Sequence, residues 1–266
     1  VLQQLGDDQA HALDLFVQQP EFGLHRLCVV AQRVAHQVEV ALHDRDGVVD
    51  FVRDAGGELA DGGELFAFHQ LLLRLLRQPY QTRPVDLRRN EQPGIEFLAR
   101  NRFGQVPVLV DGDIVLTDSH AIMLYLAGQY GDPVQHDWAP LDPLSLALVM
   151  RWLSVSANEI QNGLAIPRAV KLLNWPFDYM QGVKLGYRTL RIMDDHLAGR
   201  KWLALEHATI ADIACYPYVF LAPEGGVDTR PFHNVLAWCR RIEALPHFWP
   251  MPRLQGIPAV PLVPVP

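Results

Sequence analysis

Two short apolar runs flank an Asp-Gly pair near the middle of the chain. Val108 to Val110 and Ile114 to Leu116 are rich in β-branched residues, which favour strands. Asp111-Gly112 lies between the two runs, and Asp-Gly is a strong hairpin signal because both of its residues tolerate a positive φ. The pattern predicts a β-hairpin in which Asp111 and Gly112 both take positive φ.

A helix is predicted directly after this hairpin. Thr117, Asp118 and Ser119 are short polar residues, and the apolar positions that follow them recur at helical spacing. Such side chains accept hydrogen bonds from the unpaired N–H groups of a first helical turn. Because a helix N-terminus also carries partial positive charge, it can hold a small carboxylate.

Val106-Pro107 precedes the hairpin and suggests a second binding feature. The cis form is inexpensive only for an X-Pro bond, and a cis turn at a strand start leaves the main-chain groups of the preceding residue unpaired. An extended peptide can pair with such groups like an added strand. The alternative interpretation is that Pro107 only marks a sheet edge and that Ser119 only caps a helix.

Helical periodicity dominates the second half of the chain. Asp142-Pro143 is a typical helix start, a second helix is expected to stop at Gly199, and a last one near Pro246. Thr209 and Asp212 have the spacing of a capping box, which satisfies two N–H groups at the head of a helix. The apolar residues that set this periodicity are Leu146, Val149 and Leu153, then Met180, Val183, Tyr187, Leu190, Met193 and Leu197, then Phe232, Val235, Cys239 and Ile242.

Length and composition agree with a globular protein of two domains, since a chain of this length can bury one large core or two ordinary ones. The chain has 266 residues, is 49% hydrophobic and carries a formal charge of −7, which opposes nucleic-acid binding. No apolar run approaches the roughly 20 residues that span a bilayer, and we expect neither a membrane segment nor a leader. The three cysteines predict neither disulfides nor a zinc site, and eleven scattered histidines give no metal spacing, so we expect no metal and a cytoplasmic location.

The string GQVPVLVDGDIVLTDSHAIMLYL, residues 104–126, resembles the glutathione-binding half of the glutathione S-transferase family. The preceding pieces LLLRLLRQPY, TRPVDL and PGIEFLARN also match the family's order of helix, strand and helix. The resemblance extends over about residues 69–252 and implies an α/β thioredoxin-like domain, incomplete or altered at its first strand, followed by an all-α helical-bundle domain. We assign these domains to residues 69–133 and 139–252.

The resemblance also implies where glutathione would bind. It assigns Ser119 and the helix N-terminus to the γ-glutamyl carboxylate, and Asp118 to the ammonium group. The main chain of Val106 at Pro107, with Gln105 beside it, would pair with the cysteinyl unit. Within the helical domain, the capping box would have a structural role.

The electrophile site and the sulfur site are less defined. Trp152, Asn158 and Tyr218 are possible lining residues, although burial in the bundle explains each of them singly. The family places a Tyr, Ser or Cys beside the glutathione sulfur, but the matching residues 63–66, Gly-Glu-Leu-Phe, carry no hydroxyl or thiol. A hydroxyl from Ser154 or Ser156 could substitute, and a solvated helix face explains those two serines equally well.

Residues 1–68 do not match the family and are left unassigned. Val48 to Val52 is the nearby candidate for the missing first strand, and Leu27 to Ala31 is another apolar piece. Our hypothesis is that this segment is an extension from a rearranged, mis-started or wrong-frame reading rather than the family's native start. At the other end, residues 253–266 form a proline-rich tail.

Together these patterns predict a glutathione S-transferase-like protein. It would conjugate glutathione thiolate, its co-substrate, to a small hydrophobic electrophile, as a cytoplasmic homodimer active in detoxification. No catalytic residue is assigned. The missing sulfur-side residue leaves open a non-catalytic glutathione-fold binding protein, and a glutathione-dependent isomerase or peroxidase would use the same thiolate.

Overall fold

A computed structural model of the chain describes residues 49–54, 68–85 and 95–249. These residues belong to one compact unit, Val48–Pro266. Three of the segments discussed above lie outside the described residues: the strand candidate at 27–31, the loop at 63–66 and the proline-rich tail.

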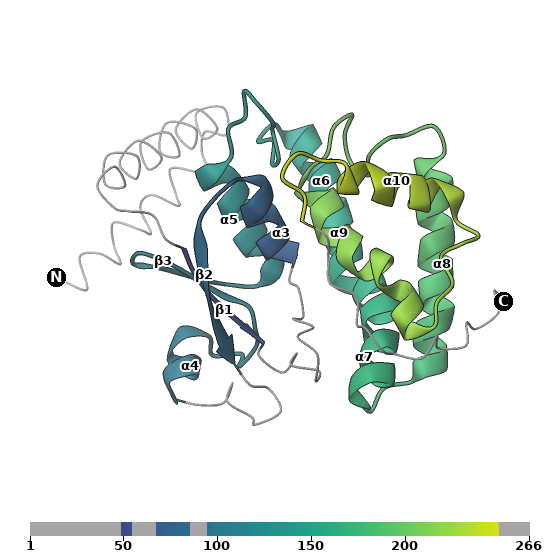
Figure 1. The fold of residues 1–266 in the computed structure, drawn as a ribbon, viewed down its shortest axis with the longest axis horizontal. Helices are drawn as coiled ribbons and strands as arrows, with labels where there is room; N and C mark the ends of the chain where they lie inside the picture. Colours follow the sequence, from purple (N-terminus) through teal and green to yellow (C-terminus); the bar gives the residue numbers. More distant parts are fainter. Residues whose placement is uncertain (1–48, 55–67, 86–94, 250–266) are drawn as a thin grey trace, which may run out of the picture. The chain divides into compact units, whose positions relative to one another are not determined.

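A mixed four-stranded sheet organises the first part of this unit (Figure 1). Its strands are β1 (Val49–Asp54), β2 (Tyr80–Val85), β3 (Val108–Asp111) and β4 (Ile114–Thr117), in the spatial order β2-β1-β3-β4. Strands β1 and β2 run parallel, whereas β1 pairs with β3, and β3 with β4, antiparallel. The predicted hairpin is therefore one edge of a larger sheet.

The first strand of the sheet comes from residues 1–68, which precede the region that resembles the family. Residues 49–54 form β1, which lies between β2 and β3 and pairs with both. The candidate at Val48 to Val52 is thus confirmed as the strand that supplies this place. The sheet gains an inner strand that residues 69–133 alone do not contain.

The hairpin is confirmed, but its turn lies one residue later than predicted. Asp111 pairs with Ile114, which leaves Gly112 and Asp113 as the two turn residues. Of these two, only Gly112 takes a positive φ, 57°. The expectation that Asp111 would do so is wrong, because Asp111 still belongs to the strand, and a two-residue turn with glycine first needs only one positive φ.

Helices cover the two faces of the sheet. Helices α3 (Phe68–Leu75) and α5 (Ser119–Tyr130) pack against each other, and α4 (Ile95–Arg100) lies apart from them (Figure 1). Strand β3 contacts helices on both faces, because successive side chains of a strand point to opposite faces of the sheet. Leu109 joins the large apolar cluster that contains α3 and α5, whereas Val108 packs with Phe97 of α4.

The second part of the unit is entirely helical. Asp142 caps the first helix as predicted, since its carboxylate accepts a hydrogen bond from the N–H of Ser145 at 3.0 Å. Gly199 ends a long helix with φ 79°. Met180, expected on the buried face, is 61% exposed, whereas Val183 and Tyr187, which follow it at helical spacing, are buried. The helices are α6 (Pro143–Val155), η1 (Ser156–Ala165), α7 (Ile166–Leu173), α8 (Tyr179–Leu197), α9 (Ile210–Phe220), η2 (Ala222–Gly225) and α10 (His233–Glu243). Within the described parts of the chain, no helix is sufficiently long and apolar to traverse a membrane.

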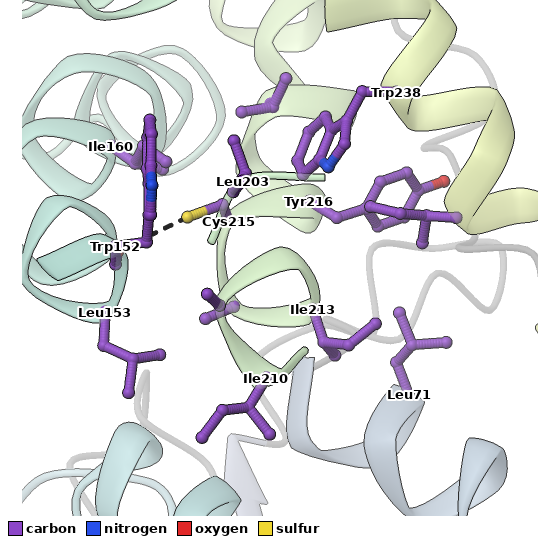
Figure 2. Close-up of a cluster of buried hydrophobic side chains, with 14 of the residues drawn as sticks. Leu71, Trp152, Leu153, Ile160, Leu203, Ile210, Ile213, Cys215, Tyr216 and Trp238 are labelled. Atoms are coloured by element: carbon purple, nitrogen blue, oxygen red, sulfur yellow. Dashed lines mark hydrogen bonds between the residues drawn. The ribbon is translucent and has the colours of Figure 1, made fainter. Parts of the chain in front are cut away.

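Helix α9 is the centre of the helical core and also joins it to the first part. Its side chain Ile213 points toward Leu71 of α3, while Cys215 and Tyr216 pack among the other helices (Figure 2). Apolar side chains from both parts of the unit therefore form one continuous cluster.

The predicted capping box at the head of α9 is confirmed. The Thr209 N–H donates to Asp212 Oδ2 at 2.9 Å, and the Thr209 hydroxyl accepts from the first turn. Asp212 is fully buried, and its Oδ1 also accepts from the Leu203 N–H and from Trp238 Nε1, both at 2.9 Å. One carboxylate thus connects three segments of the helical part.

Candidate functional site

The end of β1, the start of β3 and the end of β4 lie together at one end of the sheet. The pairing of Val52 with Val108 places the last residues of β1 beside the start of β3. The pairing of Val108 with Thr117 places the end of β4 at the same start. The register therefore brings Pro107, the head of α5 and the end of β1 together, although they are far apart in the sequence.

The cis bond predicted at Val106-Pro107 is present. Val106 is partly buried, and among the described residues none forms a hydrogen bond with its main-chain N–H or C=O. Strand β3 begins two residues later, at Val108. The main chain at Val106 therefore has both a donor and an acceptor for an extended peptide at the sheet end.

The cap of α5 is provided by Asp118 rather than by Ser119. Asp118 Oδ1 accepts from the N–H groups of His120 and Ala121, at 2.9 and 3.0 Å, and the Asp118 carbonyl accepts from Ile122. The N–H and hydroxyl of Ser119 form no hydrogen bond with any other residue that the structure describes. They are the part of the helix N-terminus that is still available to an anion.

Asp118 also presents an acceptor at this place. Its Oδ2 has no hydrogen bond to any residue that the structure describes, and the side chain is exposed. A donor pair on Ser119 and a carboxylate oxygen on Asp118 are complementary to a group that carries both a carboxylate and an ammonium. The structure thus brings together the predicted residues Gln105, Val106, Pro107, Asp118 and Ser119.

The three residues suggested for the electrophile site do not share one environment. Trp152 is 3% exposed and packs inside the bundle, where its ring lies 4.9 Å from that of His196 (Figure 2). Asn158 is exposed, and its side chain and carbonyl both accept from Asn162. Tyr218 is partly buried, and burial raises the pKa of its hydroxyl. For Trp152, the packing alternative accounts for the position.

The two serines suggested for the sulfur site have their hydroxyls engaged elsewhere. Ser154 Oγ donates to the carbonyl of Met150 at 3.0 Å, and Ser156 Oγ donates to the carbonyl of Ala214 at 3.1 Å. Neither proton is available to a thiolate in this arrangement. Among the described residues there is also no group of three or more side chains that could hold a metal ion.

Sequence reasoning missed one residue beside the site, Asn101. It follows α4, is 5% exposed and forms hydrogen bonds with the segment that leads to Pro107. The available signal was an amide residue three positions before Gly104, in a place where turns are expected.

The fold and the site define a class of protein: a thioredoxin-like domain with a peptide-sized site at one sheet end, followed by an all-helical domain. Comparison with known families agrees. The glutathione S-transferase N-terminal domain matches residues 69–134, and the C-terminal domain of the same family matches residues 178–246. Glutathione S-transferase 3 of Zea mays is 35% identical over 196 residues, which cover 69% of this chain and 84% of the maize protein. The chain belongs to the glutathione S-transferase family.

Solved structures show the same fold. A glutathione S-transferase from Pseudomonas fluorescens superposes with a TM-score of 0.68 at 28% identity, over 77% of this chain and 98% of that one. A glutathione transferase homolog from Drosophila mojavensis, solved with bound glutathione, has a TM-score of 0.61 at 24% identity, over 75% of this chain and 89% of that one.

Proposed function

We propose that this chain binds glutathione at the sheet end formed by Val106, Pro107, Asp118 and Ser119, and transfers its thiolate to a small hydrophobic electrophile. One observation carries the proposal: donors on Ser119 and an acceptor on Asp118, with no partner among the described residues, lie at the head of α5, next to the main chain of Val106. This arrangement fits a peptide that has a zwitterionic end. Membership of the family supports it.

We further propose that the protein acts as a cytoplasmic homodimer in detoxification. Cys215 is a buried thiol that forms no disulfide, which is compatible with a reducing compartment. The family resemblance supports the dimer, and sedimentation of the purified chain tests it.

A second candidate function is glutathione binding without turnover. It is favoured by the hydroxyls of Ser154 and Ser156, which both donate to main-chain carbonyls and so cannot stabilise a thiolate. A free thiol is mostly protonated near neutral pH, and conjugation requires a group that favours the thiolate.

Calorimetry with glutathione, paired with a conjugation assay on a chloronitrobenzene electrophile, tests both functions. Binding with turnover supports the transferase, and binding without turnover supports the second candidate. Absence of binding would overturn the proposed site.

Ser119→Ala tests the placement of the carboxylate. We expect it to weaken glutathione binding by about 1 to 3 kcal/mol, the usual loss for a hydrogen bond to a charged group. Ser145→Ala, at the head of α6, is the matched control and should bind as the unmodified chain does. Equal affinity of the Ser119→Ala variant by calorimetry would reject this placement.

A further inference from the structure

A single buried side chain holds the segment that leads from α4 to β3. Asn101 Nδ2 donates to the Gln105 carbonyl at 2.6 Å, and Asn101 Oδ1 accepts from the Phe103 N–H at 3.0 Å. The main chain of Asn101 is held as well, because its N–H donates to Phe97 and its carbonyl accepts from Gly104. The turn is therefore closed from inside by one amide group.

Among the described residues, no buried apolar side chain of this turn replaces these bonds. Phe103, the large hydrophobic residue of the turn, is 84% exposed and cannot anchor it by burial. Gly104 has φ 62°, a region that glycine enters at low cost, so the main chain there has several accessible conformations. The hydrogen bonds of Asn101 therefore select the course of the chain up to Gln105.

The bond to Gln105 has a direct effect on Val106. The Gln105 carbonyl and the Val106 N–H belong to one planar peptide unit, in which they point in opposite directions. Because Asn101 draws the carbonyl toward itself, the Val106 N–H is directed away from Asn101. No described residue accepts from that N–H.

We infer that Asn101 is a positioning residue for glutathione, which acts by orienting the Val106 N–H toward the peptide ligand. The inference rests on the proposed function, since that N–H is where the cysteinyl unit would pair. Asn101 acts through its hydrogen bond to the Gln105 carbonyl. It sets the direction of a donor, and a rotated peptide unit would lose the pairing without changing any residue at the site.

Asn101→Asp separates this role from general stability. The aspartate keeps an acceptor for the Phe103 N–H but places a carboxylate oxygen against the Gln105 carbonyl, which repels it and turns the peptide unit. We expect about a tenfold loss of glutathione affinity by calorimetry, the size of one well-formed hydrogen bond. If the enzyme turns over, the KM for glutathione should rise while kcat at saturating glutathione and the KM for the electrophile stay unchanged.

Three further measurements test this interpretation. Asn101→Ala removes both side-chain bonds and should lose at least as much affinity. Gly186→Ala, in the helical part, should lower the melting temperature without changing affinity, so a stability loss alone does not reproduce the effect. A crystal structure of the unliganded Asn101→Asp variant shows the orientation of the Gln105–Val106 peptide unit directly, and we expect it to be rotated.

The results distinguish this inference from the proposed function. Unchanged affinity in Asn101→Asp, with normal binding by the unmodified chain, would overturn the inference alone. Absence of binding by the unmodified chain would overturn the proposed function, and the crystal structure would then decide the role of Asn101. If the Gln105–Val106 peptide unit is not rotated in the crystal structure of the Asn101→Asp variant, the inference about Asn101 is overturned.

Discussion

At Asp118 the backbone adopts φ 73° and ψ 128°, a conformation that a residue with a side chain rarely takes. Such a conformation costs of order 1 to 3 kcal/mol and persists where the surroundings require it. Part of this cost is offset by the cap, because Asp118 Oδ1 satisfies two N–H groups of α5. The remainder is consistent with a residue held in place for ligand binding.

Asp118→Asn should separate the two tasks of this residue. Asparagine caps helices as well as aspartate does, so we expect the melting temperature to be retained. The negative charge is lost, and glutathione affinity should fall by about 1 to 3 kcal/mol if the carboxylate holds the ammonium group. Asp142→Asn, the same change at the head of α6, is the control, and calorimetry measures the glutathione affinity of both variants. Equal affinities would contradict a contact between the Asp118 carboxylate and the ammonium group.

The second prediction for a single residue concerns the buried carboxylate of Asp212. Burial raises the pKa of this carboxyl, while the hydrogen bonds from Trp238, Leu203 and Thr209 oppose the shift. Asp212→Asn replaces an oxygen acceptor with an NH₂ donor opposite N–H or O–H donors. We expect a loss of about 1 to 3 kcal/mol in the free energy of unfolding, measured by urea denaturation. Asp142→Asn, exposed and a cap in its own right, should leave stability unchanged, and an equal loss in both variants would count against the explanation.

Among the elements, the crossing of η1 with α8 is the tightest contact of the helical part. A Cβ on Gly163 would lie 2.7 Å from the Gly186 nitrogen, and a Cβ on Gly186 would collide with the Gly163 carbonyl oxygen. Two helix backbones touch here, so both positions require a residue without a side chain. The helix from Pro143 to Leu173 is also wound as a π-helix over Ser156–Ala165, the segment that makes this crossing.

Gly186→Ala should therefore destabilise the protein although alanine is the better helix former. We expect a loss of about 1 to 3 kcal/mol in thermal or urea unfolding, the range for overpacking a filled contact. Gly128→Ala in α5 is the matched control, because a Cβ there meets no atom within 4 Å. That variant should gain about 0.5 to 1 kcal/mol from helix propensity. A gain at both positions would show that the crossing can relax.

At the scale of the whole molecule, two histidines connect the linker between the domains to the loop before α9. His136 Nε2 donates to the Ala208 carbonyl at 2.7 Å, and His207 Nε2 lies 2.9 Å from the Asp137 carbonyl. The rings lie 5.5 Å apart at their centroids. Each histidine thus contacts the residue that follows the other one, and the Ile210 N–H adds a bond to the Trp138 carbonyl.

This junction should weaken in acid. Burial lowers the pKa of His136, helped by His207 and opposed by the Ala208 carbonyl, Asp137 and Asp212. Below about pH 6.5 the unfolded chain therefore binds more protons than the folded one, and stability falls as the pH drops toward the pKa of the folded state. Burial lowers the pKa of His69, His120 and His196 as well, so the effect has the same sign at all four.

His136→Gln tests this dependence. Glutamine can donate to the same carbonyl but never becomes charged, so its melting temperature should fall less than that of the unmodified chain between about pH 7 and pH 5. His233→Gln, an exposed position at the start of α10, serves as control and should follow the unmodified chain. Identical curves for His136→Gln and the unmodified chain would exclude His136 as a contributor.

Local patterns predicted much of this fold. Starts and stops of helices at Asp142, Gly199 and Thr209 were correct because a cap involves residues only a few positions apart. The turn of the hairpin was misplaced by one residue, because Asp-Gly fits more than one register and pairing across β3 and β4 selects between them. The binding residues could be proposed from the sequence because they lie in two short segments, residues 105–107 and 118–119, that only the hairpin separates.

By itself, then, the sequence determined the order of the elements from residue 69 onward and several of their caps, and it predicted which residues would form the site. Only the tertiary structure decided that β1 lies between β2 and β3, that Trp152 faces the core, and that Asp118 takes the helix cap and leaves Ser119 without a partner among the described residues. The physical reason is range. Caps and turns depend on neighbours along the chain, whereas strand partners, burial and the direction of a hydrogen bond depend on residues that only folding brings into contact.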